Sequence, residues 1–154
     1  MGKTSNLKTH MLVLACSATK KENAGRMLAI DRYDGPMWRT LRNALSGLTA
    51  EQKDRLDIWF LSAKYGFHRA DLPISSYEQL LTPKRGQELV RLPTSNHNAF
   101  RDATGKVHKI LLAGGQAYRE VMRRVIQTSS DIAETDGPGI GFHRKQLRGW
   151  LAEV

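Results

Sequence analysis

Three short, continuously apolar runs constrain the fold of this chain more than any other feature of its sequence. They are MLVLAC at residues 11–16, DIWFLSA at residues 57–63 and KILLAGG at residues 109–115. The runs barely alternate between apolar and polar residues, which is typical of parallel strands that are covered on both faces. The sequence therefore predicts three buried strands with helices packed on both sides of the sheet.

The segments between and after the three runs carry helix signals. Segment 34–48 has Pro36 at its first helical position and apolar residues spaced three and four apart. Thr49 and Gln52 match a capping box, and Thr82 is a further candidate N-cap. We expect the remaining helices at 76–81, 82–92, 116–127 and 141–151, and loops at 92–105 and 128–140.

Strands that alternate with helices predict one three-layer α/β domain with a central, mostly parallel sheet. A chain of 154 residues is long enough for one domain with its own core. We expect residues 1–9 to be a disordered leader and residues 10–154 to form the domain. The residues of the last helix that we expect to be buried are Phe142, Leu147, Trp150 and Leu151.

Several classes of protein do not fit this sequence. No apolar run approaches the ~18 residues that span a membrane, and the first ten residues contain no apolar signal region. The single cysteine excludes an internal disulfide and suits a reducing compartment. The five histidines show no HxxxH or HxH pair. We therefore expect a cytoplasmic monomer with no metal and no organic cofactor.

The net charge favours a polyanionic partner. Twenty-four lysines and arginines against fifteen aspartates and glutamates give +9, and such an excess attracts phosphate backbones. On the last two predicted helices, residues 119 and 123 share a face, as do residues 144 and 148. Each face alone could be ordinary solvated surface. Together they predict a surface that follows a DNA backbone, formed by Arg119, Arg123, Arg144, Lys145 and Arg148.

The candidate site lies where the three strands end. Right-handed crossovers bring the carboxyl ends of parallel strands to one edge of a sheet, and ligands of open α/β sheets bind there. The residues that follow the first strand are Cys16, Ser17, Thr19 and Lys20. Those that follow the other two are Ser62, Lys64, Tyr65 and His68, and then Gly114, Gly115 and Gln116.

Different chemistry is expected from these side chains. The two glycines directly before a helix suit an anion, or else they form a tight turn. Tyr65 could stack on a base or cover the sheet edge. Cys16 fits a packing role better than a covalent one, because no Cys–His–Asn pattern is legible. Ser17 and Thr19 are hydroxyl donors for a phosphate or a base, and Lys20 could hold either one or attack a sugar.

The order of these motifs resembles a family of small phage and bacterial domains of long-unassigned function. The shared marks are C-S-x-x-K at Cys16–Lys20, L-S-A-K-Y-G at 61–66 and G-x-G-I-G at 137–141. This family is similar to the archaeosine synthase core and, distantly, to the YaaA peroxide-stress proteins. The chain departs from archaeosine synthase at Ala15 and Lys21, where that enzyme has prolines.

The resemblance implies a fold like that of uracil-DNA glycosylases and a substrate that is a base, often a modified one, in nucleic acid. It implies a pocket lined by Cys16, Ser17, Lys20, Ser62, Lys64, Tyr65 and Tyr77. Some relatives are thought to defend against phages as glycosylases that act on modified DNA. The chain does not show the aspartate-bearing water-activating motif of uracil-DNA glycosylases.

These observations favour a DNA glycosylase that extrudes a base and cleaves its N-glycosidic bond. Asp31 or Glu78 would stabilise the sugar cation or orient water, and Lys20, Lys64 or His68 would support the leaving base. A lysine could instead attack the sugar and form a Schiff base. Two other functions stay open: a non-catalytic DNA-binding module, and a hydrolase or transferase of free nucleotides.

Overall fold

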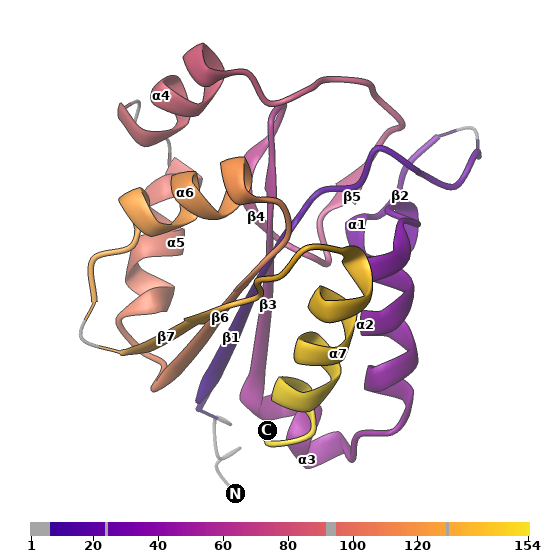
Figure 1. Ribbon diagram of the computed structural model, residues 1–154, viewed down its shortest axis with the longest axis vertical. Helices are drawn as coiled ribbons and strands as arrows, with labels where there is room; N and C mark the ends of the chain where they lie inside the picture. The colour runs from indigo at the N-terminus through magenta and orange to yellow at the C-terminus, as the bar shows by residue number, and fades with distance from the viewer. Residues whose placement is uncertain (1–6, 24, 92–94, 129) are drawn as a thin grey trace, which may run out of the picture.

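A five-stranded sheet lies between two layers of helices in the computed structural model, which describes residues 7–23, 25–91, 95–128 and 130–154 (Figure 1). The strand order is β4-β3-β1-β6-β7. β1 pairs in parallel with β3 and β6, β7 is parallel to β6, and β4 runs antiparallel to β3. This confirms the predicted α/β class and the mostly parallel sheet. The strands are β1 His10–Ala15, β3 Leu56–Ser62, β4 Gly66–Arg69, β6 Lys109–Ala113 and β7 Asp131–Glu134.

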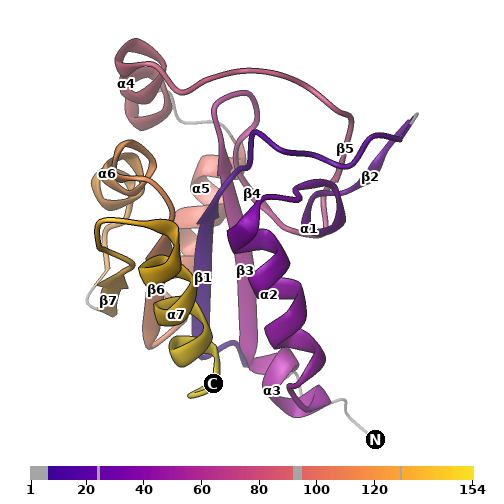
Figure 2. The same cartoon turned by 45° about the vertical axis from the view of Figure 1, so that its right-hand side comes forward.

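Helices cover both faces of the sheet (Figure 2). One face carries α1 Ala29–Arg32, α2 Pro36–Ser46 and α7 Ile140–Leu151. The opposite layer contains α4 Pro83–Arg91, α5 Ser95–Thr104 and α6 Gln116–Val125. The short helix α3 Ala50–Arg55 leads into β3, and β2 Met27–Leu28 pairs with β5 Pro73–Ile74 in a separate two-stranded ribbon.

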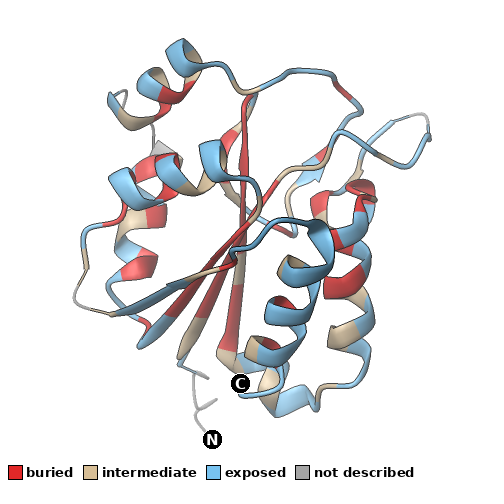
Figure 3. Ribbon diagram, viewed as in Figure 1, coloured by how far each residue is buried: buried red, intermediate tan, exposed pale blue. Residues whose placement is uncertain are grey.

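The central strand β1 shows why the first apolar run has no polar side. Leu12 and Leu14 pack in the core on the α2 and α7 face, whereas Met11 and Val13 pack against α5 and α6. Successive side chains of a strand point to opposite faces, so a strand between two helical layers is apolar at most positions. The buried residues in Figure 3 accordingly run along β1 and its neighbours.

The predicted helix starts agree with the structure at three places. Pro36 is the first residue of α2, with Gly35 as the N-cap. Thr49 and Gln52 form the expected capping box, in which each side chain accepts a hydrogen bond from the other residue's backbone N–H. Thr82 Oγ1 accepts the backbone N–H of Arg85, as expected for an N-cap.

Three segment assignments were wrong. Segment 76–81 is not helical, because its side chains are anchored to the sheet edge through Tyr77 and Gln79. Residues 95–104 of the expected loop form α5, since Phe100 and Ala103 supply a narrow apolar stripe that polar neighbours conceal. Residues 131–134 form the exposed edge strand β7, which needs no apolar run.

The buried face of the last helix is also smaller than predicted. Leu147 and Leu151 are buried and Trp150 is half-buried, but Phe142 is 55% exposed. Phe142 instead packs against Gly137 in the loop before the helix.

The chain before β1 is described only from residue 7, so residues 1–6 of the leader expected at 1–9 lie outside the described residues. Thr9 continues the pairing of the central strand β1 by one residue, because its N–H donates to Arg55 O and its carbonyl accepts from His108 N. Among the described residues, no helix has both the length and the apolar character that crossing a membrane requires.

Candidate functional site

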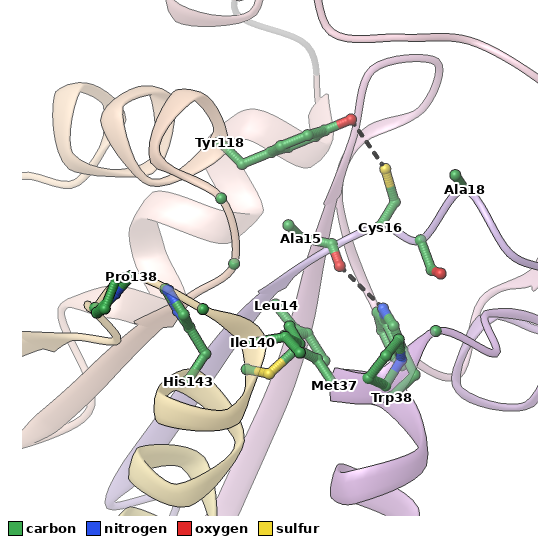
Figure 4. Close-up of a pocket in the computed structure, with 17 residues that line it drawn as sticks. Leu14, Ala15, Cys16, Ala18, Met37, Trp38, Tyr118, Pro138, Ile140 and His143 are labelled. Carbon is green, nitrogen blue, oxygen red and sulfur yellow. Dashed lines mark hydrogen bonds between the residues drawn. The ribbon is translucent and has the colours of Figure 1, made fainter.

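A crevice opens where the connections from β1 and β6 separate. The chain leaves β1 toward α1 and α2 on one face, and it leaves β6 toward α6 on the other. Because adjacent parallel strands continue to opposite faces, their carboxyl ends leave a gap between them. A cleft of about 540 Å³ occupies this position, and we call it the main cleft. Its lining consists of residues 14–18, residues 35–38, Gly114, Gly115, Tyr118, residues 137–140 and His143 (Figure 4).

Three helices begin at the main cleft, and each has a glycine N-cap. The caps are Gly35 of α2, Gly115 of α6 and Gly139 of α7. Because glycine has no side chain, none of these caps can accept a hydrogen bond from the first backbone N–H groups of its helix. The first backbone N–H groups of a helix have no intrahelical partner and carry a partial positive charge. The main cleft is therefore surrounded by donors for an anion.

Glycines also allow the backbone segments around the main cleft to approach closely. A Cβ on Gly114 would lie 2.5 Å from Ala15 Cβ, and a Cβ on Gly35 would lie 2.3 Å from Ser17 Oγ. Trp38 Nε1 donates to Ala15 O at 2.9 Å, which ties the end of β1 to α2 (Figure 4). The site is thus built from close contacts between strand ends and helix starts.

A second pocket of about 360 Å³, which we call the lysine pocket, adjoins the main cleft. The two share four lining residues, so they meet along the loop after β1 and at the first turn of α6. Leu80, which is 79% exposed, lies at the lysine pocket. The full lining is Cys16, Ser17, Ala18, Lys20, Glu78, Gln79, Leu80 and Tyr118.

Cys16 and Tyr118 lie at the boundary between the two pockets. The Cys16 thiol donates to the Tyr118 hydroxyl at 3.3 Å (Figure 4), and burial raises the pKa of Tyr118. Cys16 also packs against the core on the α2 face. These contacts agree with a packing role for Cys16 within the wall of the site.

Lys20 holds its amine over an aromatic ring in the lysine pocket. Its Nζ lies 4.5 Å from the centroid of the Tyr77 ring and 5.8 Å from that of Tyr33. Burial lowers the pKa of Lys20, and this effect exceeds the opposing influence of Cys16 and Glu78. A cation held over aromatic faces is attracted to them, so the side chain has a defined position.

Tyr77 belongs to a buried hydroxyl network under the lysine pocket. Its hydroxyl contacts Ser62 Oγ at 2.7 Å and the Tyr33 hydroxyl. Ser62 Oγ accepts the backbone N–H groups of Lys64 and Tyr65, at 3.0 and 3.1 Å. Burial raises the pKa of Tyr33 and of Tyr77, so their hydroxyls remain protonated. Ser62 and Tyr77 therefore shape the β3–β4 turn and the floor beneath Lys20.

Other predicted residues lie near the pockets without lining them. Lys64 is exposed, with its Nζ 5.3 Å from the Tyr65 centroid and 5.5 Å from that of Tyr77. Tyr65 packs edge-on against Tyr77 at 5.2 Å. Thr19 and Gln116 are exposed at the edges of the site. None of the four residues lines either pocket in the part of the chain that the structure describes.

Two predicted catalytic residues, Asp31 and His68, are likewise not in the described lining of either pocket. Asp31 is exposed on α1 and is absent from the described lining of both pockets. His68 stacks on Phe60 with a centroid distance of 6.0 Å, and burial lowers its pKa. Of the two candidate carboxylates, Glu78 alone shares a pocket with Lys20 in the described chain.

The predicted DNA-backbone residues divide into two groups. Arg119 and Arg123 both contact the carboxylate of Glu134, at 3.1 Å each. On α7, Arg144, Lys145 and Arg148 are all exposed, and Arg144 also donates to Thr40 Oγ1. The positive face on α6 is therefore partly neutralised, because the edge strand β7 supplies an acidic partner.

Two residues at the main cleft, His143 and Thr135, were not among the predicted site residues. His143 lines the main cleft, and its Nδ1 lies 2.7 Å from the Oγ1 of buried Thr135. That oxygen also accepts the N–H of Gly114 at 3.3 Å. The hydroxyl proton of Thr135 can then be donated to His143 Nδ1. In that arrangement the imidazole carries its own proton on Nε2, which becomes an N–H donor. The only available signal was the position of His143 just after G-x-G-I-G.

Buried Arg32 was also missed. Its guanidinium donates to the carbonyls of Lys21, Asn23 and Gly25 at 2.8, 3.2 and 2.7 Å. It is fully buried, as is the neighbouring Tyr33. Arg32 thus holds the loop that follows Lys20, although in the sequence it looks like any surface arginine.

Comparisons with protein families, curated proteins and solved structures find no match to this chain. Within the described residues, no group of three or more His, Cys, Asp or Glu side chains is arranged to hold a metal ion.

Proposed function

We propose that this protein acts on a base in DNA and cleaves its N-glycosidic bond, with the uracil-DNA-glycosylase-like fold that the sequence resemblance implies. One observation carries the proposal: a cleft suited to phosphate adjoins a pocket that is lined by the aromatic ring of Tyr118, an amine and a carboxylate. A nucleotide has the same division, with an anionic backbone on one side and a flat base on the other. Its glycosidic bond would then lie near the boundary at Cys16 and Tyr118.

The main cleft supplies the contacts to the backbone of the substrate. The glycine-capped starts of α2, α6 and α7 offer N–H groups that no side chain caps in the described chain. Ser17 Oγ and the ring of His143 add polar side chains to the same wall. A phosphate of a flipped nucleotide fits such a set of donors.

The lysine pocket supplies the groups that act on the base and the sugar. Lys20 can donate a proton or a hydrogen bond to the base as it leaves with negative charge. Glu78 can stabilise the developing positive charge on the sugar or orient the attacking water. Tyr118 and Leu80 line the space in which the base would lie.

A second candidate is an enzyme that acts on free nucleotides. It is favoured by the pairing of Arg119 and Arg123 with Glu134, which reduces the charge available to follow a DNA backbone. A mononucleotide would need the two pockets alone.

The test is to incubate the protein with genomic DNA that carries normal or modified bases, and with the matching mononucleotides. Released bases and abasic sites are measured by mass spectrometry. Release from DNA supports the proposal, product from mononucleotides alone favours the second candidate, and binding without release from either refutes both. Glu78→Gln should lower the rate by about 100-fold or more. Asp31→Asn should leave it near wild type, since the described pocket linings do not include Asp31.

A further inference from the structure

Lys20 is the amine of the lysine pocket, and its position suits covalent chemistry. It shares the pocket with Glu78 and Cys16. Its Nζ lies 4.5 Å from the Tyr77 centroid and donates to Ala18 O at 3.4 Å. An amine that faces a cavity and is held in one place can meet an electrophile in a defined geometry.

The backbone around Lys20 is held by hydrogen bonds to the segment at Arg32 and Tyr33. Lys20 forms an isolated antiparallel bridge with Tyr33, and Lys21 N donates to Arg32 O at 2.8 Å. The buried guanidinium of Arg32 then binds three carbonyls of the loop that follows. Lys20 therefore projects from a fixed backbone, although it lies outside the central sheet.

The environment also increases the share of neutral amine. Burial is the largest influence on Lys20 and lowers its pKa, while the nearby Cys16 and Glu78 act in the opposite direction. The Tyr77 and Tyr33 rings, by contrast, favour the charged form of the amine. A lysine must lose its proton before it can attack a carbonyl.

We propose that Lys20 forms an imine with the aldehyde of a base-free deoxyribose, so that the protein captures the sugar that base release would leave. This inference rests on the proposed function. The Lys20 nitrogen donates its electron pair to C1′ of the ring-opened sugar, and the C1′ oxygen takes up a proton. Loss of water then leaves a C=N bond. Glu78 accepts a proton from the nitrogen and returns it to the departing hydroxyl, and water later reverses the reaction.

Lys20 fits this role better than its neighbours. Lys64 approaches the same ring at 5.5 Å but is exposed and does not line the described pocket. Lys21 is exposed, and the described lining does not include it. Lys21 is therefore a matched control with the same side chain at the next position.

The experiment uses an oligonucleotide that already contains one abasic site, together with sodium cyanoborohydride to reduce any imine. Covalent protein–DNA product is measured on denaturing gels, and the modified lysine is located by peptide mass spectrometry. We expect wild type and Lys21→Arg to agree within twofold, and Lys20→Arg to lose at least tenfold. Arginine keeps the cation over Tyr77, so a loss with an unchanged melting temperature assigns the reaction to the amine.

Peptide mapping of the wild-type adduct is a second readout that does not depend on any variant. Modification of Lys20 supports the proposal, and modification of another lysine overturns it. Undiminished trapping by Lys20→Arg also overturns it. Because the abasic site is supplied ready-made, a failure to release bases would refute the glycosylase function and leave this result unaffected.

Discussion

The close contact between Gly114 and Ala15 makes Gly114→Ala a direct test of how the main cleft is built. Gly114 has φ +129°, which side chains rarely adopt, and holding such a backbone costs about 1–3 kcal/mol. The new Cβ would lie 2.5 Å from Ala15 Cβ, and overpacking of this kind costs about 1–3 kcal/mol. We therefore expect a loss of about 2–6 kcal/mol, against a typical domain stability of 5–15 kcal/mol.

The assay is equilibrium unfolding in urea, followed by circular dichroism and by the fluorescence of the tryptophans. Gly115→Ala is the matched control, because its added Cβ meets nothing within 4 Å and its φ is −65°. Its cost should be about 1 kcal/mol or less, from the poorer N-cap.

A double variant separates the two contributions at Gly114. Ala15→Gly combined with Gly114→Ala removes the overlap of the two Cβ atoms but leaves the backbone strain. It should be more stable than the sum of the two single changes predicts. If Gly114→Ala is no less stable than Gly115→Ala, or if the double variant shows no coupling, the described approach of β6 to β1 is incorrect.

Three further predictions concern buried hydroxyls, acid stability and surface charge. Tyr77→Phe leaves two buried hydroxyl partners short of a bond, so urea unfolding should show a loss of about 1–3 kcal/mol; no loss would contradict the network. Because burial lowers the pKa of His68 below 6.5, the unfolded state takes up its proton first. Stability should therefore fall as pH drops below 6.5, with a shallower slope in His68→Asn; an unchanged slope refutes this. Glu134→Gln frees Arg119 and Arg123. If the proposed DNA substrate follows this face, the salt dependence of its binding should steepen by up to about two phosphate contacts, and an unchanged slope refutes a backbone contact there.

The three central strands β1, β3 and β6 and most helices could be predicted because their signals are local. A strand covered on both faces is a short run that is apolar at most positions, and a capping box spans only four residues. Helix α5 and strand β7 were missed for the opposite reason. The few apolar residues of α5 and the exposed edge position of β7 acquire meaning only from the elements that they contact.

Some features of the candidate site could likewise be predicted from the sequence, and others could not. That residues after the three strands gather at one edge follows from parallel pairing, and the structure brings Cys16, Ser17, Lys20, Gly114 and Gly115 to the two adjoining pockets. The preference for Glu78 over Asp31 could not be read from the sequence, because both are carboxylates on connecting segments.

By itself, the sequence determined the α/β class and the parallel central strands, and it predicted the edge of the sheet for the candidate site. Hydrophobic periodicity is a local signal, and strands joined through helical crossovers pair in parallel. Only the tertiary structure decided which side chains share a pocket. It placed His143 in the main cleft, paired Arg119 and Arg123 with Glu134, and set Lys20 over the ring of Tyr77. Each of these contacts joins residues from separate elements, and their distances depend on how the two helical layers pack against the sheet.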